Sequence, residues 1–226
     1  MRRPHASSPP DGVSATFWTL CVDEPLGDAF VLDVGTGSGR LAIALAPVAR
    51  AVVGIDTNRG AIADAMARAE SLDLANVTFR VADADAIDYR TLTLDAPALV
   101  TAHLFLSESL VAQGARALAP GGALVALGFH VDQWRETGRS SRFAFDEARM
   151  ARLVTLHGLR LEHLSVERDV ATFETIHQAL AAVRGHEAQW QADGRWTRYR
   201  AFLEAGGRTL TRSHLIVKAR KATAAA

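Results

Sequence analysis

Residues 30–39 read Phe-Val-Leu-Asp-Val-Gly-Thr-Gly-Ser-Gly, a short apolar run followed by three alternating glycines. The apolar run has the length and the β-branched content of a buried strand, and residues 38–46 have a helical pattern that Pro47 ends. Glycine lets a backbone approach a ligand closely. A glycine-rich loop between a strand and a helix therefore predicts a site for a nucleotide-type ligand.

On both sides of this loop, short apolar runs alternate with helical patterns. Asn58 is placed to cap a helix that carries Ile62, Met66 and Ala69 on one stripe. This alternation is typical of a parallel α/β sheet with helices on both faces. Strands are predicted at 30–34, 51–56, 77–83, 98–103, 123–129, 159–169 and 214–219, and further helices at 106–118 and 145–157.

Residues 171–210 depart from the alternation of strands and helices, because their apolar residues repeat at helical spacing. We expect a helical insertion before the last strand. The folded domain is expected to cover 13–219, with a flexible Pro- and Ser-rich segment at 1–12 and a flexible small-residue tail at 220–226. The two helical stripes of the insertion are Phe173, Ile176, Leu180 and Val183, then Trp196, Tyr199 and Leu203.

The composition excludes several classes of protein. With 226 residues, 49% of them hydrophobic and 22% charged, the chain is a globular protein and not a disordered or fibrous one. Its 25 Lys and Arg residues balance 25 Asp and Glu residues, so the overall charge does not favour nucleic-acid binding. No apolar run approaches the ~20 residues that span a bilayer, and no apolar signal segment is recognisable, so we expect a cytoplasmic protein without a membrane partner.

A metal centre is not expected either. Cys21 is the only cysteine, which excludes a disulfide framework and a multi-thiolate metal site. The eight histidines lack the H-x-x-x-H or H-x-H spacing of a metal-binding pair. We therefore predict no metal-binding residues.

Two nucleotide-type ligands compete for the glycine loop. A dinucleotide fingerprint needs a glycine at position 40, where this chain has Arg40. Asp33 would also hold a negative charge against a pyrophosphate, whereas it would attract a cation. A sulfonium compound with a free amino group therefore suits the loop better than NAD does.

With these features, residues 30–129 resemble the class I S-adenosylmethionine-dependent methyltransferases. The turn Leu-Ala-Pro-Gly-Gly at 118–122, which precedes an apolar strand, resembles the same family. The resemblance implies a Rossmann-like α/β fold with a seven-stranded, mostly parallel sheet whose last strand is antiparallel. It also implies S-adenosyl-L-methionine as the cofactor and methyl transfer as the activity.

The resemblance further implies which residues hold the cofactor. Asp56 corresponds to the acid that takes both ribose hydroxyls, and one carboxylate has the two acceptor oxygens that a vicinal diol needs. Asp83 corresponds to the acid that holds the adenine amino group, with Asp85 as a substitute. Asp56 and Asp83 could alternatively be helix caps or surface charges. The implied cofactor-binding residues are Asp33, Gly35, Thr36, Gly37, Gly39, Asp56, Thr57, Asp83, Ala84 and His103.

The end of the fourth strand reads His103-Leu104-Phe105-Leu106, which lacks the polar amide and proline pair of nucleobase amino-methyltransferases. Methylation of adenine or cytosine amino groups is therefore not expected. His103 is the candidate catalytic residue, because it could accept a proton from an O–H or N–H nucleophile. A histidine that only contacts the cofactor or packs beneath a helix is the alternative.

Substrate selection is expected in the variable segments. The candidate acceptor-binding residues are Trp18, His130, Trp134, Trp196 and Tyr199. The insertion also interleaves aromatics with arginines, a pattern that fits a lid over a planar or anionic acceptor, an RNA-binding face, or simple packing. The arginines of this pattern are Arg184, Arg195, Arg198 and Arg200.

The leading hypothesis is methyl transfer from S-adenosyl-L-methionine to an oxygen or nitrogen of a small-molecule acceptor. The alternatives are methylation of RNA or protein, a non-catalytic cofactor-binding subunit and, least favoured, an NAD-linked dehydrogenase. The acceptor, the acceptor atom and the oligomeric state are left open by the sequence.

Overall fold

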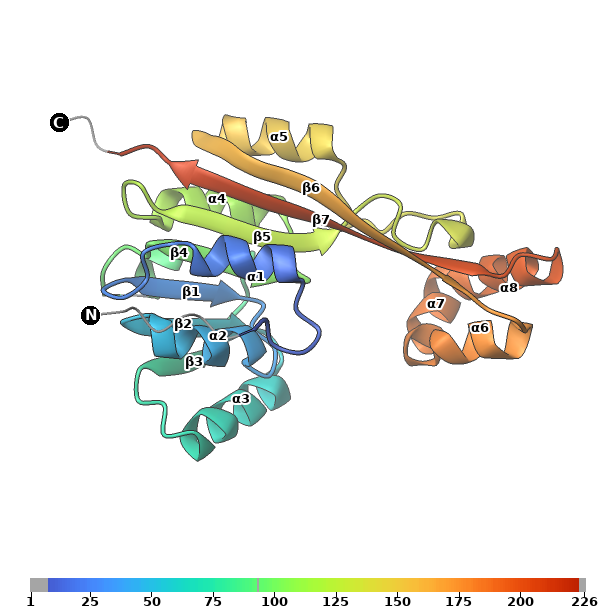
Figure 1. Cartoon of the computed structure of the whole chain (residues 1–226), viewed down its shortest axis with the longest axis horizontal. Helices are drawn as coiled ribbons and strands as arrows, with labels where there is room; N and C mark the ends of the chain where they lie inside the picture. Colours follow the sequence, from blue (N-terminus) through green and yellow to red (C-terminus); the bar gives the residue numbers. More distant parts are fainter. Residues whose placement is uncertain (1–7, 93, 224–226) are drawn as a thin grey trace. The chain divides into compact units, whose positions relative to one another are not determined.

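The computed structural model describes residues 8–92 and 94–223, and its central element is one seven-stranded sheet (Figure 1). The strand order is β3-β2-β1-β4-β5-β7-β6; the first five strands pair in parallel and the last strands are antiparallel. The expected fold class is confirmed. The strands are β1 Phe30–Val34, β2 Ala51–Asp56, β3 Val77–Val81, β4 Leu99–His103, β5 Ala123–Phe129, β6 Leu159–Thr172 and β7 Thr209–Lys221.

The chain divides into two compact units. The first unit contains the residues up to Gly128, Glu147–Ser165 and the residues from Ile216 onward. The second unit contains Phe129–Asp146 and Val166–Leu215. Strands β6 and β7 contribute residues to both units.

Register and packing place helices on both faces of the sheet in the first unit (Figure 1). Val31 pairs with Leu99 across β1 and β4, and both pack in a core with α1, α2 and α3. The next pair, Leu32 and Val100, points to the other face, because side chains alternate along a strand. There a Cβ on Gly114 of α4 would lie 3.6 Å from Val100. The helices of this unit are α1 Ala15–Val22, α2 Arg40–Leu45, α3 Arg59–Ser71, α4 Glu108–Ala117 and α5 Glu147–Leu156, with 3-10 turns η1 Ala46–Val48 and η2 Tyr89–Thr91.

Helix α3 begins as expected but presents a different face to the core. The Asn58 side chain accepts two backbone N–H groups of the first turn, at 3.0 and 3.1 Å. Ile62 and Ala69 are buried, whereas Met66 is 49% exposed. Ala65 takes the expected place of Met66, because a small residue lets the helix approach the sheet closely. The prediction of Met66 as a core residue was therefore wrong.

The helical insertion is confirmed in the second unit, between the end of β6 and the start of β7. A capping box of Thr175 and Gln178 begins its first helix. Trp190, Tyr199 and Leu203 are fully buried in its core. The helical elements are α6 Ile176–Ala182, η4 Arg184–His186, α7 Glu187–Asp193 and α8 Arg195–Glu204, together with η3 Arg135–Thr137 in the segment after β5.

Strand β7 is longer than the expected 214–219, since it runs to Lys221. Arg220 and Lys221 therefore belong to the sheet and not to the flexible tail expected at 220–226. Residues 1–7 of the expected flexible N-terminal segment and residues 224–226 lie outside the described residues. No helix within the described residues is both long enough and apolar enough to span a membrane.

A buried ion-pair network joins the start of the first unit to β6 and β7. The Glu24 carboxylate lies 2.5 Å from Lys218 Nζ and 2.7 Å from Arg220 Nη2, and Glu162 lies 2.7 Å from Arg220 Nε. Burial raises the pKa of Glu24, but hydrogen bonds from Arg220 and Lys218 outweigh it and lower the pKa below its ordinary value. The network thus holds a charged carboxylate beside a lysine that is 7% exposed.

We predict that Glu24→Gln lowers the free energy of unfolding by about 3 kcal/mol at pH 7, because it leaves Lys218 buried without its anion. The control Asp95→Ala breaks an exposed pair with Arg50 and should cost less than ~1 kcal/mol. Because the Glu24 pKa is lowered on folding, its contribution is present at neutral pH and is lost as the pH falls below the ordinary value of 4.5. Urea unfolding at pH 7 and pH 4 measures both effects; equal losses for both variants would contradict the prediction.

Candidate functional site

The glycine loop after β1 is a tight turn, and its glycines differ in what surrounds them. Gly35, Gly37 and Gly39 have φ angles of 70°, 55° and 78°, a region that other residues avoid. A Cβ on Gly39 would lie 2.7 Å from Phe79 and 2.9 Å from Ala65, so this glycine permits α3 and β3 to pack beside the loop. A Cβ on Gly37 would meet no atom within 4 Å. Gly37 therefore leaves open space at the surface of the loop.

That open space belongs to a cavity at the carboxyl ends of β1 and β4, the edge where open α/β sheets bind ligands. The cavity brings together four expected cofactor residues of the loop with His103. Five other lining residues were missed by sequence reasoning. Leu104 and Arg40 adjoin recognised positions, whereas Val13 is the first residue of the expected folded domain and carried no signal of a binding role. The lining residues are Val13, Asp33, Gly35, Thr36, Gly37, Ser38, Arg40, Leu41, His103 and Leu104.

Asp33 is the buried acid of this cavity. It is 1% exposed, and its Oδ2 accepts a hydrogen bond of 2.6 Å from the Thr36 hydroxyl. Burial raises the pKa of Asp33 to about 7, although the bond from Thr36 acts in the opposite direction. Because the pKa is raised on folding, the free protein loses stability as the pH rises from the ordinary value of 3.8 to about 7, and above that pH the loss is complete. A cation placed beside Asp33 would reverse this penalty.

Asp56 lies beside the glycine loop, at the end of β2. Its Oδ2 accepts the Gly37 N–H at 2.9 Å and its Oδ1 accepts the Asn58 N–H at 2.8 Å. Each carboxylate oxygen has a second lone pair, so both can still accept a ligand hydroxyl. Thr57 follows on the exposed surface. The structure therefore brings Asp56 next to the loop, in a pose fixed by two backbone donors.

The segment after β3 places Asp83 and Ala84 at the same sheet edge. Asp83 is exposed and its Oδ1 accepts the Asp85 N–H at 2.9 Å, while Ala84 is buried. Asp85, the expected substitute, already accepts the Ser107 hydroxyl at 2.8 Å. Asp83 is thus the acid with more free acceptor capacity, and the backbone turn keeps it at the surface.

His103 and Leu104 form the wall at the end of β4. The half-buried His103 ring lies 5.2 Å from the Phe17 ring of α1, tilted by 59°. Leu104 has a φ of 62°, which is unusual for a bulky residue, and its side chain is 51% exposed. A Cβ on Gly35 would lie 3.0 Å from Phe105, so the glycine lets this wall approach the loop. The β4 end therefore presents an imidazole and an apolar side chain to the cavity.

Of the residues expected to bind an acceptor, one belongs to the first unit and four to the second, and two of the five are packing residues. Trp18 is 4% exposed in the core of the first unit. Tyr199 is fully buried in the second unit, with its hydroxyl donating to the Thr209 carbonyl at 3.2 Å. Because both side chains are buried in hydrophobic cores, they have almost no exposed surface with which to contact an acceptor.

The other three candidates belong to the second unit. Trp134 lies 5.1 Å from Trp190 at its aromatic core, and Trp196 packs against that core. His130 is 5% exposed, and its Nδ1 lies 3.2 Å from both the Asp132 N–H and the Ser213 hydroxyl. The local contacts of all three residues account for their positions within this unit.

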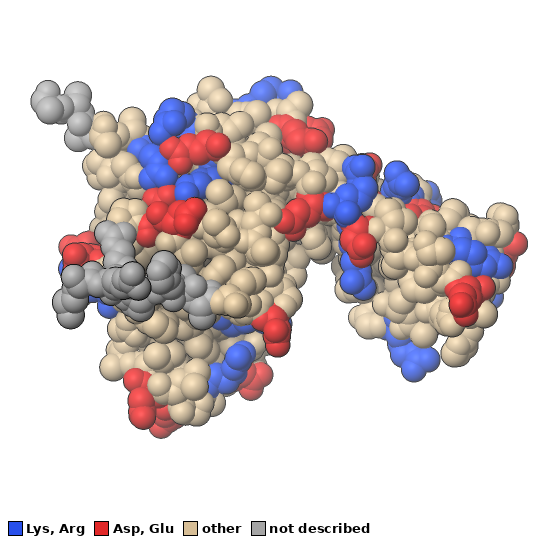
Figure 2. Space-filling view, in the orientation of Figure 1, with Lys and Arg blue, Asp and Glu red and all other residues tan. Residues whose placement is uncertain are grey.

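Two arginines of the insertion, Arg195 and Arg200, pair with carboxylates of the second unit. Arg195 is 5% exposed and is paired with Asp193, whose backbone carbonyl also accepts Arg139 Nη1 at 2.6 Å. Arg200 pairs with Glu204 at 3.3 Å. Figure 2 shows basic and acidic side chains interleaved on the visible surface of this unit. This mixed pattern differs from the continuous basic face that nucleic acids require.

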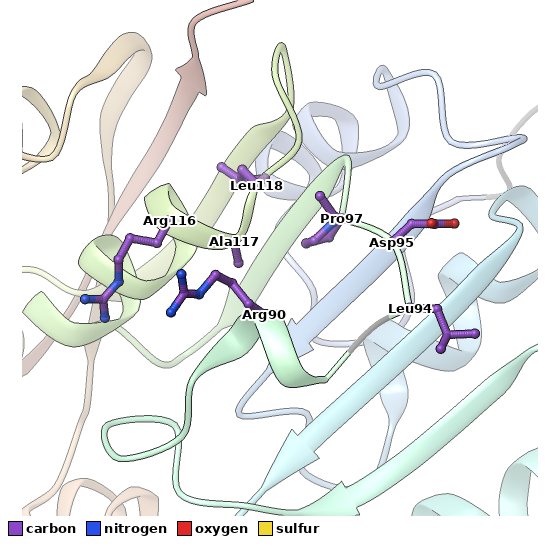
Figure 3. A pocket seen from close by; sticks show the side chains of 8 residues that line it. Arg90, Leu94, Asp95, Pro97, Arg116, Ala117 and Leu118 are labelled. Carbon is purple, nitrogen blue, oxygen red and sulfur yellow. The ribbon is translucent and has the colours of Figure 1, made fainter. Parts of the chain in front are cut away.

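A second hollow in the first unit lies at the opposite edge of the sheet, before β4 and β5 (Figure 3). Arg90 and Arg116 extend on the same side of it. Asp88 binds the Arg90 guanidinium through Nε and Nη2, at 3.0 and 2.6 Å. Asp95, which also lines the hollow, pairs with Arg50. Because its charges are largely paired at the exposed surface, this hollow is a weaker candidate than the cavity around Asp33.

Comparison with known proteins agrees with the cavity's position. Residues 31–122, which contain the glycine loop and the ends of β1 to β4, match a protein family described as a methyltransferase domain. This match agrees with the expected resemblance to the class I S-adenosylmethionine-dependent methyltransferases. The cofactor that goes with such a domain is S-adenosyl-L-methionine.

Three individual proteins similar to this chain set the limits of that assignment. A protein-L-isoaspartate O-methyltransferase from Xanthobacter autotrophicus is 50% identical over 56 residues, which are 25% of this chain and about a quarter of that relative. A Bacillus halodurans structure provisionally assigned as a methyltransferase has a TM-score of 0.67 at 21% identity, covering 93% of this chain and 100% of its own. The 4+2 cyclase SpnF has a TM-score of 0.60 at 20% identity, covering 92% of this chain and 82% of its own. The structural likenesses show the shared fold alone.

We predict that Gly37→Val mainly impairs cofactor binding, whereas Gly39→Ala mainly impairs stability. Gly37→Val places a side chain at the open surface of the loop and should abolish cofactor binding, while backbone strain costs only about 1–2 kcal/mol of stability. Gly39→Ala drives a Cβ into Phe79 and should mainly lower stability. Thermal unfolding and calorimetric titration of both variants separate the effects. Undiminished affinity in Gly37→Val would show that the cofactor lies elsewhere.

Proposed function

We propose that this protein transfers the methyl group of S-adenosyl-L-methionine to an oxygen or nitrogen of a small-molecule acceptor. The observation that carries the proposal is the cavity in which a buried Asp33 carboxylate, an open glycine loop and the His103 imidazole face the same space. When bound, the cofactor supplies a methyl group on a positively charged sulfur.

The residues present fit this cofactor chemically. Asp33 offers a desolvated carboxylate to the ammonium of the methionine part, and Gly37 leaves the space that part requires. Asp56 has spare acceptor capacity for two ribose hydroxyls. Asp83 is available to the adenine amino group, with Ala84 beside it. Each contact uses a group that the adjacent strand end holds in place.

His103 is the proposed proton acceptor of the reaction. Its half-buried ring lines the cavity and packs against Phe17, which limits its rotation. A neutral imidazole can take the proton of an attacking hydroxyl or amine. The remaining contribution of the chain is alignment and exclusion of water, which suffice for much of a displacement at an activated centre.

The walls favour an acceptor with apolar surface. Leu104 projects from the β4 end with half of its side chain exposed, and Leu41 and Val13 also line the cavity. Protein methylation is the main alternative, since the Xanthobacter relative is named for a protein acceptor. RNA is less favoured, because the insertion's Arg195 and Arg200 are paired within their own unit.

The first test of this function is proton release on cofactor binding. Asp33 has a pKa of about 7 in the free protein, and an ammonium beside it favours the carboxylate, so binding below pH 7 expels a proton. Affinity should therefore rise between pH 6 and pH 8. Calorimetry in buffers of different ionisation enthalpy should show proton release at pH 6 that fades by pH 8.

Asp33→Asn should lose both the proton release and most of the affinity. The control Asp64→Asn changes an exposed acid on α3 and should behave as the wild type does. Binding that is independent of pH in the wild-type protein would contradict the proposed role of Asp33.

The second test separates the acceptor classes. With cofactor labelled at the methyl group, we expect label to enter the small-molecule fraction of a cell extract and not the RNA or protein fractions. His103→Ala should reduce this transfer by about 10²- to 10⁴-fold while cofactor affinity changes little, as expected for loss of a general base. Label in protein or RNA would replace the proposed acceptor class. Cofactor binding without any transfer would indicate a non-catalytic subunit.

A further inference from the structure

Arg40 is the residue that breaks the dinucleotide pattern, and the structure gives it a contact far away in the sequence. It follows the glycine loop as the first residue of α2. Its Nη1 donates a hydrogen bond of 2.9 Å to the backbone carbonyl of Asp11. The N-terminal segment is thereby attached to the loop that forms the cavity.

The segment that Arg40 binds is a turn shaped to receive a guanidinium. The Val13 N–H donates to the Pro10 carbonyl at 2.9 Å and closes the turn. Gly12 has a φ of 74°, and a Cβ on it would lie 2.7 Å from Arg40 Nη1. The guanidinium therefore occupies the space that any other side chain at position 12 would need.

The turn carries Val13 to the wall of the cavity, next to Asp33 and Gly37. Val13 is 8% exposed. Directly after it, the Ser14 hydroxyl accepts the Phe17 N–H at 3.2 Å and begins α1. The turn is thus anchored by α1 on one side and by Arg40 on the other.

Arg40 also separates two hollows. It lines the cavity around Asp33, and it lines an outer hollow on the surface of α2. Since Arg40 lines both, shortening its side chain should widen both hollows and let more water approach Asp33. Water weakens the attraction between a carboxylate and a bound cation, because it raises the local dielectric. The other residues of the outer hollow are Pro10, Asp11, Ile43, Ala44 and Arg68.

We propose that Arg40 is a positioning residue that fastens the turn Pro10–Val13 against the glycine loop, so that Val13 closes the methionine end of the cofactor cavity. This role rests on the proposed function, because it assigns the cavity to the cofactor. The proposed role explains why position 40 departs from the dinucleotide pattern. An arginine side chain can hold the turn in place, whereas a glycine there could not.

A double-mutant cycle tests the contact between Arg40 and Gly12. Arg40→Ala should weaken S-adenosylhomocysteine binding by about three- to tenfold, the range expected when one hydrogen bond is lost. Gly12→Ala should weaken it similarly, because its methyl group displaces the guanidinium. The double variant should be no weaker than the worse single variant, since both changes remove one interaction.

Two controls distinguish positioning from general damage. Arg40→Lys, which retains a donor for the Asp11 carbonyl, should recover part of the affinity. Arg152→Ala, an exposed change on α5, should leave affinity unchanged. The melting temperature of the free protein should stay close to the wild-type value in the Arg40 and Arg152 variants, and Gly12→Ala should lower it slightly, because a φ of 74° strains an alanine.

The outcomes separate this inference from the function on which it rests. Wild-type affinity in Arg40→Ala, or fully additive effects in the double variant, would overturn the role of Arg40 and leave the proposed function standing. Failure of the wild-type protein itself to bind S-adenosylhomocysteine would overturn both.

Discussion

The carboxylate of Asp33 imposes the constraint on which the rest of the site depends. It lies at the end of a buried strand, is 1% exposed and has the neutral Thr36 hydroxyl as its hydrogen-bond partner. Burying a carboxylate is costly, and burial raises the pKa of Asp33 to about 7 as a result. A site that keeps such a group gains most from a ligand that carries a positive charge. The glycines beside it let that ligand reach the carboxylate, and the wall from Val13 to Leu104 limits the water that would compete.

The strand order alone places the other acidic side chains of the site beside Asp33. Parallel strands β1, β2 and β3 end at one edge, so Asp33, Asp56 and Asp83 follow one another along it. The fold does not determine the reaction, as the similarity to a cyclase illustrates. We propose that the chemistry depends on the end of β4, where His103 and Leu104 line the cavity. The imidazole can accept a proton from the acceptor, and the apolar side chain beside it can bind an apolar part of the same molecule.

Much of this arrangement could be predicted from the sequence, because continuous apolar runs specify buried strands. The ranges 30–34, 51–56 and 123–129 coincide with β1, β2 and β5. Helical periodicity was less decisive, because it predicts an apolar face but not which residues at its border are buried. In α3, Ala65 is buried where Met66 was expected. Asp33, Asp56 and Asp83 were identified because each stands at or near the carboxyl end of a strand.

Residues that depend on non-local contacts could not be predicted. Val13 directly follows the Pro- and Ser-rich segment 1–12, and we propose that its place in the cavity wall depends on the hydrogen bond between Arg40 and the Asp11 carbonyl. Trp18 and Tyr199 have the side chains of binding residues, yet both are buried in cores. An aromatic side chain serves either role, and only its neighbours in space decide which.

The central claim is that the cavity around Asp33 takes an adenosyl ligand with a charged amino group. The most direct measurement is parallel calorimetric titration of the purified protein with S-adenosyl-L-methionine, S-adenosylhomocysteine and NAD at pH 8. We expect micromolar binding of both adenosyl ligands at one site per chain and no binding of NAD. Binding of NAD alone, or of none of the three, would contradict it.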